Sequence, residues 1–244
     1  MIAAHWRLPD APLRASAVAT ALLALVAVIA LAEVARAVLP LGDLYSVKAG
    51  ATFTVVILVA LGFLQRSHPF PRFGAANQIT TIRAVLVALI VALFGEPRFP
   101  SVAAGAALTS LLAASLDGVD GWLARRQRIA SAFGARFDME IDALLILVLA
   151  ILVSRFEKAG PWVIVSGLLR YIFAGAGRYW PWLAAPLPPS RRRQTICVVQ
   201  IVALTIALLP AVAPPLSTIC AAVALVSLAY SFLVDSLWLW RHAR

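Results

Sequence analysis

The feature that most constrains this chain is a series of long apolar runs separated by short polar segments. Each run has roughly 17–25 residues, the length that an α-helix needs to cross the hydrocarbon core of a bilayer. With 62% hydrophobic and 13% charged side chains, the chain has little sequence left for a soluble domain. We therefore predict an all-α fold, a polytopic integral membrane helix bundle of about eight transmembrane helices. The predicted spans lie near residues 15–38, 49–65, 77–94, 102–124, 137–154, 161–178, 195–212 and 216–239.

The first run could instead be part of a secretory signal, because Arg7 and Arg14 precede it and the segment ARA at 35–37 resembles a cleavage site. The apolar stretch from Ala15 to Ala32 is longer than the core of a usual signal, about 7–15 residues. We interpret this run as a retained helix.

Basic residues are unevenly distributed between the segments that connect the runs. If the N-terminus lies inside, most of the 21 Lys and Arg residues fall in inner segments, while Arg83 and Arg170 lie within spans. Short cytoplasmic loops are enriched in positive charge, so we expect both termini inside, in an inner (plasma) membrane. Because the net charge of +10 is spread over these loops, nucleic-acid binding is not expected.

Acidic residues gather between two of the runs, at the side predicted to face the cytoplasm. On a helix, Asp117 and Asp120 lie on one stripe together with Gly121 and Ala124. On the next helix, spacings of four place three further residues on one face, and Glu140 points away from it. These three residues are Gly134, Asp138 and Asp142. Four carboxylates can then converge.

Such convergence calls for a positive partner. A carboxylate near the centre of a membrane helix costs about 2.5–3.5 kcal/mol, and like charges raise the cost. Hard divalent cations relieve this repulsion, and a pair of them can clamp the oxygens of a phosphoryl displacement. Gly121, Ala124 and Gly134 leave room on the same faces, either for a nucleotide diphosphate or for a neighbouring helix.

The full spacing is Asp117-x-x-Asp120-Gly121-x-x-Ala124-Arg125, eight residues, and then Gly134-x-x-x-Asp138-x-x-x-Asp142. This pattern resembles the signature of the CDP-alcohol phosphotransferase family, membrane enzymes that transfer a phosphoalcohol or phosphatidyl group from a CDP-linked donor to a hydroxyl. The segment NQITTIR at 77–83 resembles the start of the family's first core helix, and RRRQTICVVQ at 191–200 resembles its Gly-Lys-x-x-Thr stretch. In the second segment, Arg191 and Arg192 replace the usual Gly and Lys.

The resemblance implies a division of roles. Asp117, Asp120, Asp138 and Asp142 would hold two divalent cations, Mg²⁺ or Mn²⁺, and Asp142 would also be the general base. The CDP group would be bound by residues of three segments: Gly121, Ala124, Arg125, Thr80, Asn77 and Gly134. Arg170 and the basic edge of Arg191, Arg192 and Arg193 would bind an acceptor or lipid phosphate, although topology anchoring explains that edge equally well.

Arg83 and the chain's first two spans need separate explanations. A buried Arg83 requires an anion or carboxylate partner, unless its side chain extends to the interface. The resemblance implies a six-helix core at 67–244, preceded by an N-terminal extension at 1–66 with two transmembrane helices. It also implies a homodimer.

The predicted activity is transfer of a phosphatidyl group from CDP-diacylglycerol to a hydroxyl acceptor, with release of CMP, in phospholipid biosynthesis. We favour glycerol 3-phosphate as acceptor, because a basic edge suits a phosphorylated alcohol. Inositol phosphate, serine and a donor of the CDP-choline type remain alternatives. An ion or proton transporter would also use intramembrane carboxylates, but it does not explain Arg125 or the glycines.

Overall fold

The computed structural model describes residues 11–64, 68–127, 131–188 and 190–242, with the side chains of 119–127 left undescribed. Within these ranges the chain forms eight α-helices and two short 3-10 helices, and no strand. The predicted all-α fold is therefore confirmed. The chain divides into two compact units, the first comprising Met1–Val102 and Leu108–Ile141, the second comprising Ala103–Ala107 and Asp142–Arg244. Each unit is described by itself.

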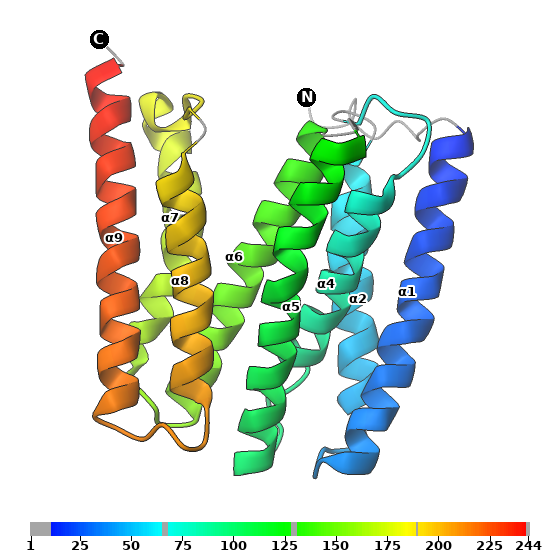
Figure 1. The fold of residues 1–244 in the computed structure, drawn as a ribbon, viewed down its shortest axis with the longest axis vertical. Helices are drawn as coiled ribbons and strands as arrows, with labels where there is room; N and C mark the ends of the chain where they lie inside the picture. Colours follow the sequence, from blue (N-terminus) through cyan, green and yellow to red (C-terminus); the bar gives the residue numbers. More distant parts are fainter. Residues whose placement is uncertain (1–10, 65–67, 128–130, 189, 243–244) are drawn as a thin grey trace. The chain divides into compact units, whose positions relative to one another are not determined.

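Each helix overlaps one of the predicted apolar runs. In chain order they are α1 (Ala11–Val38), α2 (Tyr45–Gly62), α4 (Ala75–Val91), α5 (Pro100–Gln127), α6 (Ala132–Arg155), α7 (Ile164–Tyr179), α8 (Arg191–Leu208) and α9 (Leu216–His242) (Figure 1). Two 3-10 helices, η1 (Pro161–Val163) and η2 (Pro181–Ala184), flank α7.

Some of these helices have the length and composition of membrane spans. In the described part of the chain, four stretches qualify: Ala11–Val38, Tyr45–Gly62, Pro100–Gly118 and Leu216–His242. Many of their large apolar side chains are exposed, among them Leu23 at 73% and Val226 at 68%. Such surfaces suit lipid rather than water, as expected of a helical membrane protein. The count of eight spans remains a prediction.

In the first unit, α1, α2 and α4 pack against one another. The hydroxyl of Tyr45 in α2 donates to the carbonyl of Leu89 in α4, with an O···O distance of 2.9 Å. Beyond the end of α4, the buried Glu96 carboxylate accepts a hydrogen bond from the Gly42 amide at 2.6 Å and pairs with Lys48. The two N-terminal helices are thus attached to the helix that carries NQITTIR. The proposed boundary between 66 and 67 stays a prediction.

The start of α6 is fixed by polar contacts. The Ser131 hydroxyl accepts a hydrogen bond from the Gly134 amide at 3.0 Å, which caps the first turn. The same hydroxyl lies 3.0 Å from Nδ1 of His68, whose Nε2 lies 2.8 Å from the Arg72 carbonyl oxygen. This buried imidazole therefore joins the segment before α4 to the start of α6.

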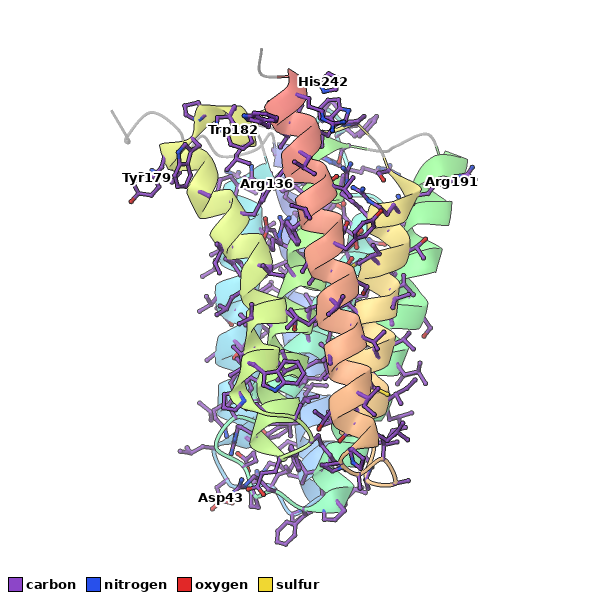
Figure 2. The ribbon with its side chains drawn as sticks, turned by 90° about the vertical axis from the view of Figure 1, so that its left-hand side faces the viewer. Asp43, Arg136, Tyr179, Trp182, Arg191 and His242 are labelled. Carbon is purple, nitrogen blue, oxygen red and sulfur yellow. The ribbon has the colours of Figure 1, made fainter. Side chains whose placement is uncertain are left out.

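In the second unit, α7, α8 and α9 form a helical group in which α8 and α9 pack closely. Residues at one end of this group include aromatic and basic side chains, as is usual at a membrane–water boundary (Figure 2). Those labelled there are Tyr179, Trp182, Arg191 and His242. Because α8 begins and α9 ends at this end, the two helices are antiparallel.

The span predicted near 195–212 is offset by four residues from the observed helix, because α8 runs from Arg191 to Leu208. The arginines interpreted as a loop form the first turn of the helix instead. At the other end, Leu209 adopts extended backbone angles, because the following Pro210 disfavours the helical conformation before it. Lys158 then donates to three carbonyl oxygens beyond the helix, those of Leu209, Pro210 and Val212.

Candidate active site

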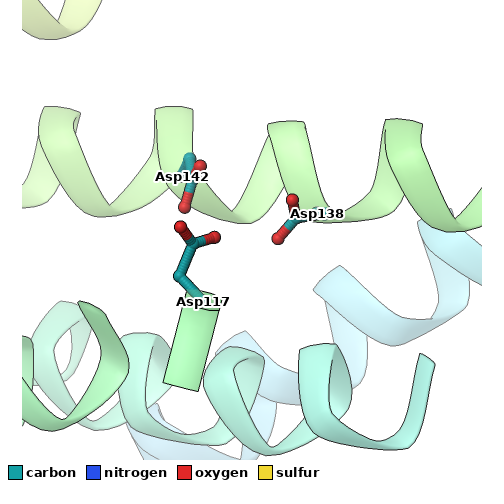
Figure 3. Close-up of side chains that lie close together, drawn as sticks. All are labelled: Asp117, Asp138 and Asp142. Atoms are coloured by element: carbon teal, nitrogen blue, oxygen red, sulfur yellow. The ribbon is translucent and has the colours of Figure 1, made fainter. Parts of the chain in front are cut away.

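Three of the predicted metal ligands meet. Helix α6 carries Asp138 and Asp142 one turn apart on the same face, and α5 carries Asp117. One carboxylate oxygen from each of the three residues lies within 4.8 Å of the others, and all three side chains are partly buried. In Figure 3 the carboxylate of Asp117 points toward α6 and faces Asp142, with Asp138 to one side. The expected convergence is present for these three residues.

A cationic side chain from α4 is part of the same cluster. Arg83 is 0% exposed, and its Nη1 lies 2.9 Å from Oδ1 of Asp117 and also pairs with Oδ1 of Asp138. Its Nε donates to the Ala113 carbonyl oxygen at 3.1 Å. Of the two interpretations of Arg83, the carboxylate partner is correct and extension to the interface is not. The arginine partly offsets the repulsion between carboxylates that lie close together.

The donor set fits a divalent metal ion. Carboxylate oxygens are the ligands preferred by hard cations such as Mg²⁺, and three carboxylates facing one guanidinium leave negative charge in excess. The cluster could therefore hold a metal ion.

Four residues of the motif have side chains outside the described part of the structure. Asp120, Gly121, Ala124 and Arg125 belong to α5, but their side chains fall in the part of the helix left undescribed. Their predicted roles in metal and nucleotide binding remain predictions.

Of the residues expected to bind nucleotide from α4 and α6, Asn77 and Thr80 are buried, and Gly134 is half-buried beside Asn77. Asn77 is 5% exposed and donates from Nδ2 to the Phe73 carbonyl oxygen at 2.5 Å, while the Thr80 hydroxyl donates to Ala76 at 3.2 Å. A Cβ added to Gly134 would lie 2.7 Å from Oδ1 of Asn77. Gly134 thus permits close contact between α6 and α4, which was the alternative to a nucleotide role. Nucleotide binding by these three residues stays a prediction.

The residues expected to bind a phosphate differ in their surroundings. Arg170 is half-buried on α7, and Arg191 is exposed at the start of α8. Arg192 and Arg193 both pair with Asp235 of α9, with Nη1 of Arg193 3.2 Å from Oδ1. Asp235 is 6% exposed.

Sequence analysis missed Asp235 and Cys197. An acid within the apolar α9 was a usable signal for the first, because intramembrane charges require partners. The thiol of Cys197 donates to Oδ2 of Asp142 at an S···O distance of 3.5 Å. No sequence pattern indicated this contact, which joins α8 to α6.

Comparison with known proteins identifies the class. Residues 73–233 match the family model described as CDP-alcohol phosphatidyltransferase. The chain belongs to this family of membrane transferases, as the aspartate motif predicted. The match covers α4 to most of α9 and leaves out α1 and α2.

Similar proteins in three bacteria are named CDP-diacylglycerol–glycerol-3-phosphate 3-phosphatidyltransferase. The chain is 25% identical over 124 residues to the protein of Bacillus subtilis (strain 168), which is 43% of this chain and 64% of that protein. It is 32% identical over 107 residues to that of Pseudomonas fluorescens, 43% of this chain and 54% of the relative. For Salmonella choleraesuis (strain SC-B67) the identity is 30% over 112 residues, 45% and 60% respectively. The matched region thus spans less than two thirds of each relative. No solved structure matches the chain.

Proposed function

We propose that the protein transfers a phosphatidyl group from CDP-diacylglycerol to the hydroxyl of a small alcohol, with glycerol 3-phosphate as the leading acceptor. The observation that carries this proposal is the meeting of Asp117, Asp138 and Asp142 at positions that match the family motif. The names of the three relatives support the choice of donor and acceptor. Family membership favours this activity over ion transport.

In the proposed reaction, the acceptor oxygen attacks the phosphorus next to the lipid, and the bond from that phosphorus to the CMP oxygen breaks. The proton of the acceptor hydroxyl passes to a carboxylate oxygen of Asp142, and CMP leaves with the electrons of the broken bond. Asp142 suits this role because it is partly buried beside the carboxylates of Asp117 and Asp138.

Asp117, Asp120, Asp138 and Asp142 would hold two divalent cations, Mg²⁺ or Mn²⁺. Bound there, the cations would supply Lewis acidity that stabilises the charge of the diphosphate and acidifies the acceptor hydroxyl. Arg83 keeps Asp117 and Asp138 in place from the side of α4. Gly121, Ala124 and Arg125 would bind the CDP group, since a planar guanidinium donates to two phosphate oxygens at once.

The proposed setting is an inner (plasma) membrane. The site would face the cytoplasm with both termini inside, following the distribution of basic residues. The active form would be a homodimer with about eight spans per chain. The bilayer would present the lipid of the donor, while CMP and the acceptor enter from water.

The direct test uses purified protein in detergent with radiolabelled CDP-diacylglycerol and Mg²⁺. A panel of glycerol 3-phosphate, inositol phosphate, serine and glycerol is added singly, and CMP and the lipid product are both measured. We expect stoichiometric CMP and phosphatidylglycerophosphate with glycerol 3-phosphate, and no reaction in EDTA. Absence of CMP with every acceptor would reject the proposed activity.

A further inference from the structure

Helices α1 and α2 precede the region that matches the family model, which begins just before α4. Beyond the last residue of α4 they are held by Glu96, which pairs with Lys48 and accepts the Gly42 amide. A second set of contacts lies at the first turn of α4, about 25 Å away for a helix of 17 residues. There the start of α4 meets the start of α6, where Asn77 and Gly134 lie close together. Helices outside the family match therefore also reach the turns that carry proposed nucleotide ligands.

Ser16 of α1 holds the segment that leads into α4. Its half-buried hydroxyl oxygen accepts a hydrogen bond from the Phe73 amide at an N···O distance of 3.4 Å. The Phe73 carbonyl oxygen accepts a hydrogen bond from Nδ2 of Asn77, the side chain that lies against Gly134. One residue is thus bonded both to α1 and to a proposed nucleotide ligand. Because the Phe73 side chain is only 1% exposed, it cannot move without its neighbours, and α1 helps to fix where α4 begins.

An aromatic cluster connects the same segment to the first two turns of α6. The ring centroids of Phe73 and Phe133 lie 6.0 Å apart, and those of Phe133 and Phe137 lie 5.8 Å apart. The His68 ring lies edge-on to Phe133 at 5.9 Å. All four side chains are buried, and closely packed rings resist rearrangement. Asp138 directly follows Phe137, so the packing of these rings fixes the turn of α6 that carries this proposed metal ligand.

Helix α2 contacts α6 directly through a cation–π pair. The guanidinium carbon of Arg136 lies 5.3 Å from the ring centroid of Phe63, the C-cap residue of α2. A cation at this distance from an aromatic face is attracted by the ring. Arg136 is two residues from both Gly134 and Asp138, and therefore lies on the opposite side of α6. The contact with Phe63 is thus made behind the candidate site, where Arg136 does not need to touch a substrate.

We propose that α1 and α2 position the donor site: through Ser16 and Phe63 they set the spacing of the α4 and α6 turns that carry Asn77 and Gly134, where the nucleotide of CDP-diacylglycerol would bind. This inference rests on the proposed transferase activity and goes further, because it gives a role in donor binding to helices outside the family match. Ser16 and Phe63 act through other residues of the core, so they are positioning residues rather than substrate ligands. Helices that only enlarged the packing surface would contribute to stability alone.

The first test compares purified full-length Ser16→Ala with the unchanged protein. We expect the KM for CDP-diacylglycerol to rise about threefold, as for the loss of one long hydrogen bond. The kcat should stay within about twofold, because saturating donor restores the spacing. Ser16→Thr keeps the hydroxyl and should keep the donor KM. Thr20→Ala is the matched control, since it removes a hydroxyl one turn along α1 that bonds within the helix, to the Ser16 carbonyl oxygen.

The second test is a double-mutant cycle of Phe63→Leu and Arg136→Gln. Each single variant should raise the donor KM about two- to fivefold, the range for an exposed cation–π pair, and the double variant no more than either alone. Phe63→Trp keeps an aromatic face and should keep the donor KM. If Arg136 instead attracts the anionic donor directly, the two effects multiply, and the positioning role of α2 is overturned.

Glu96→Gln separates positioning from a general loss of stability. It weakens the attachment at the far end of α4, so it should lower the Tm and leave the donor KM within about twofold. A donor KM that rises as much as in Ser16→Ala would overturn the proposal, and so would an unchanged donor KM in both Ser16→Ala and Phe63→Leu. Should Ser16→Ala fail to fold, the cycle of the exposed Phe63 and Arg136 decides alone. If the unchanged protein releases no CMP with any acceptor, the transferase activity itself fails, and this inference fails with it.

Discussion

Nη1 of Arg83 lies 2.9 Å from Oδ1 of Asp117, so a fully buried arginine of α4 is in direct contact with the first aspartate of the motif on α5. The same nitrogen pairs with Asp138 of α6. Three helices are therefore connected at the candidate metal site by one side chain. Such an arginine keeps the two carboxylates together, and it would share them with a metal ion bound at the proposed site.

Arg83→Met tests whether the arginine and a metal ion both stabilise the Asp117 and Asp138 carboxylates. In the metal-free protein, Asp117 and Asp138 would lose their positive neighbour, and we expect the free energy of unfolding to fall by about 1–3 kcal/mol, discounted because both carboxylates are partly exposed. With Mg²⁺ present the loss should be smaller, because the cation supplies the missing charge. Thermal unfolding in detergent, in EDTA and in Mg²⁺, measures the difference. Arg178→Met, an exposed change on α7, should behave alike in both conditions. Equal losses for Arg83→Met with and without Mg²⁺ would contradict the idea.

Asp142→Asn tests the proposed general base. The amide cannot take the proton of the acceptor, so the rate of CMP release should fall about 10²–10⁴-fold, the usual contribution of such a group. The far-ultraviolet circular dichroism spectrum should stay unchanged. Glu140→Gln makes the same chemical change on the same helix, but two residues away and thus on the other side. Comparable rate losses in the two variants would remove the special role of Asp142.

Gly134→Ala tests the contact between α6 and α4. The added methyl group would lie 2.7 Å from Oδ1 of Asn77, whose amide is already hydrogen-bonded to Phe73. Overpacking of this kind costs about 1–3 kcal/mol, measured as a lower unfolding free energy. Gly175→Ala on α7, where no atom lies within 4 Å of the new Cβ, should instead gain about 0.5–1 kcal/mol.

A double variant tests whether Asn77 causes the loss of stability in Gly134→Ala. When Asn77→Ala is combined with Gly134→Ala, the amide that the new methyl group would meet is absent. The loss in unfolding free energy of the double variant should therefore be smaller than the sum of the losses of the two single variants. Additive losses would show that Gly134 is sensitive for a reason other than Asn77.

Glu96→Gln tests the attachment of α1 and α2 to α4. The nearly buried carboxylate pairs with Lys48 and accepts the Gly42 amide, and the amide side chain would leave Lys48 without its charge partner. We expect a loss of about 1–3 kcal/mol in unfolding free energy, because Lys48 is 34% exposed and part of the effect is screened. Asp43→Asn breaks the pair with Arg36, in which Asp43 is 99% exposed, and should cost less than about 1 kcal/mol. A Glu96 loss no larger than that of Asp43 would count against this attachment.

Local sequence pattern predicted the helices well, because the length of an apolar run and its period are properties of neighbouring residues. The N-terminal end of α8 is an exception. Arg191, Arg192 and Arg193 are charged, so they were interpreted as a loop, yet Asp235 of α9 compensates two of them and the helix starts there. Whether a charged segment forms a loop or a helix therefore depends on the charged residues that contact it in the folded protein.

The chain's aspartate spacing and its apolar runs by themselves determined that this is an all-helical member of the CDP-alcohol phosphatidyltransferase family, since helix formation and the motif depend on residues near one another. Only the tertiary structure decided that Arg83 pairs with Asp117 and Asp138, that Asp235 holds two arginines, and that Cys197 lies against Asp142. These pairs join residues far apart in the chain. Their contact depends on how whole helices pack, which no local pattern of residues encodes.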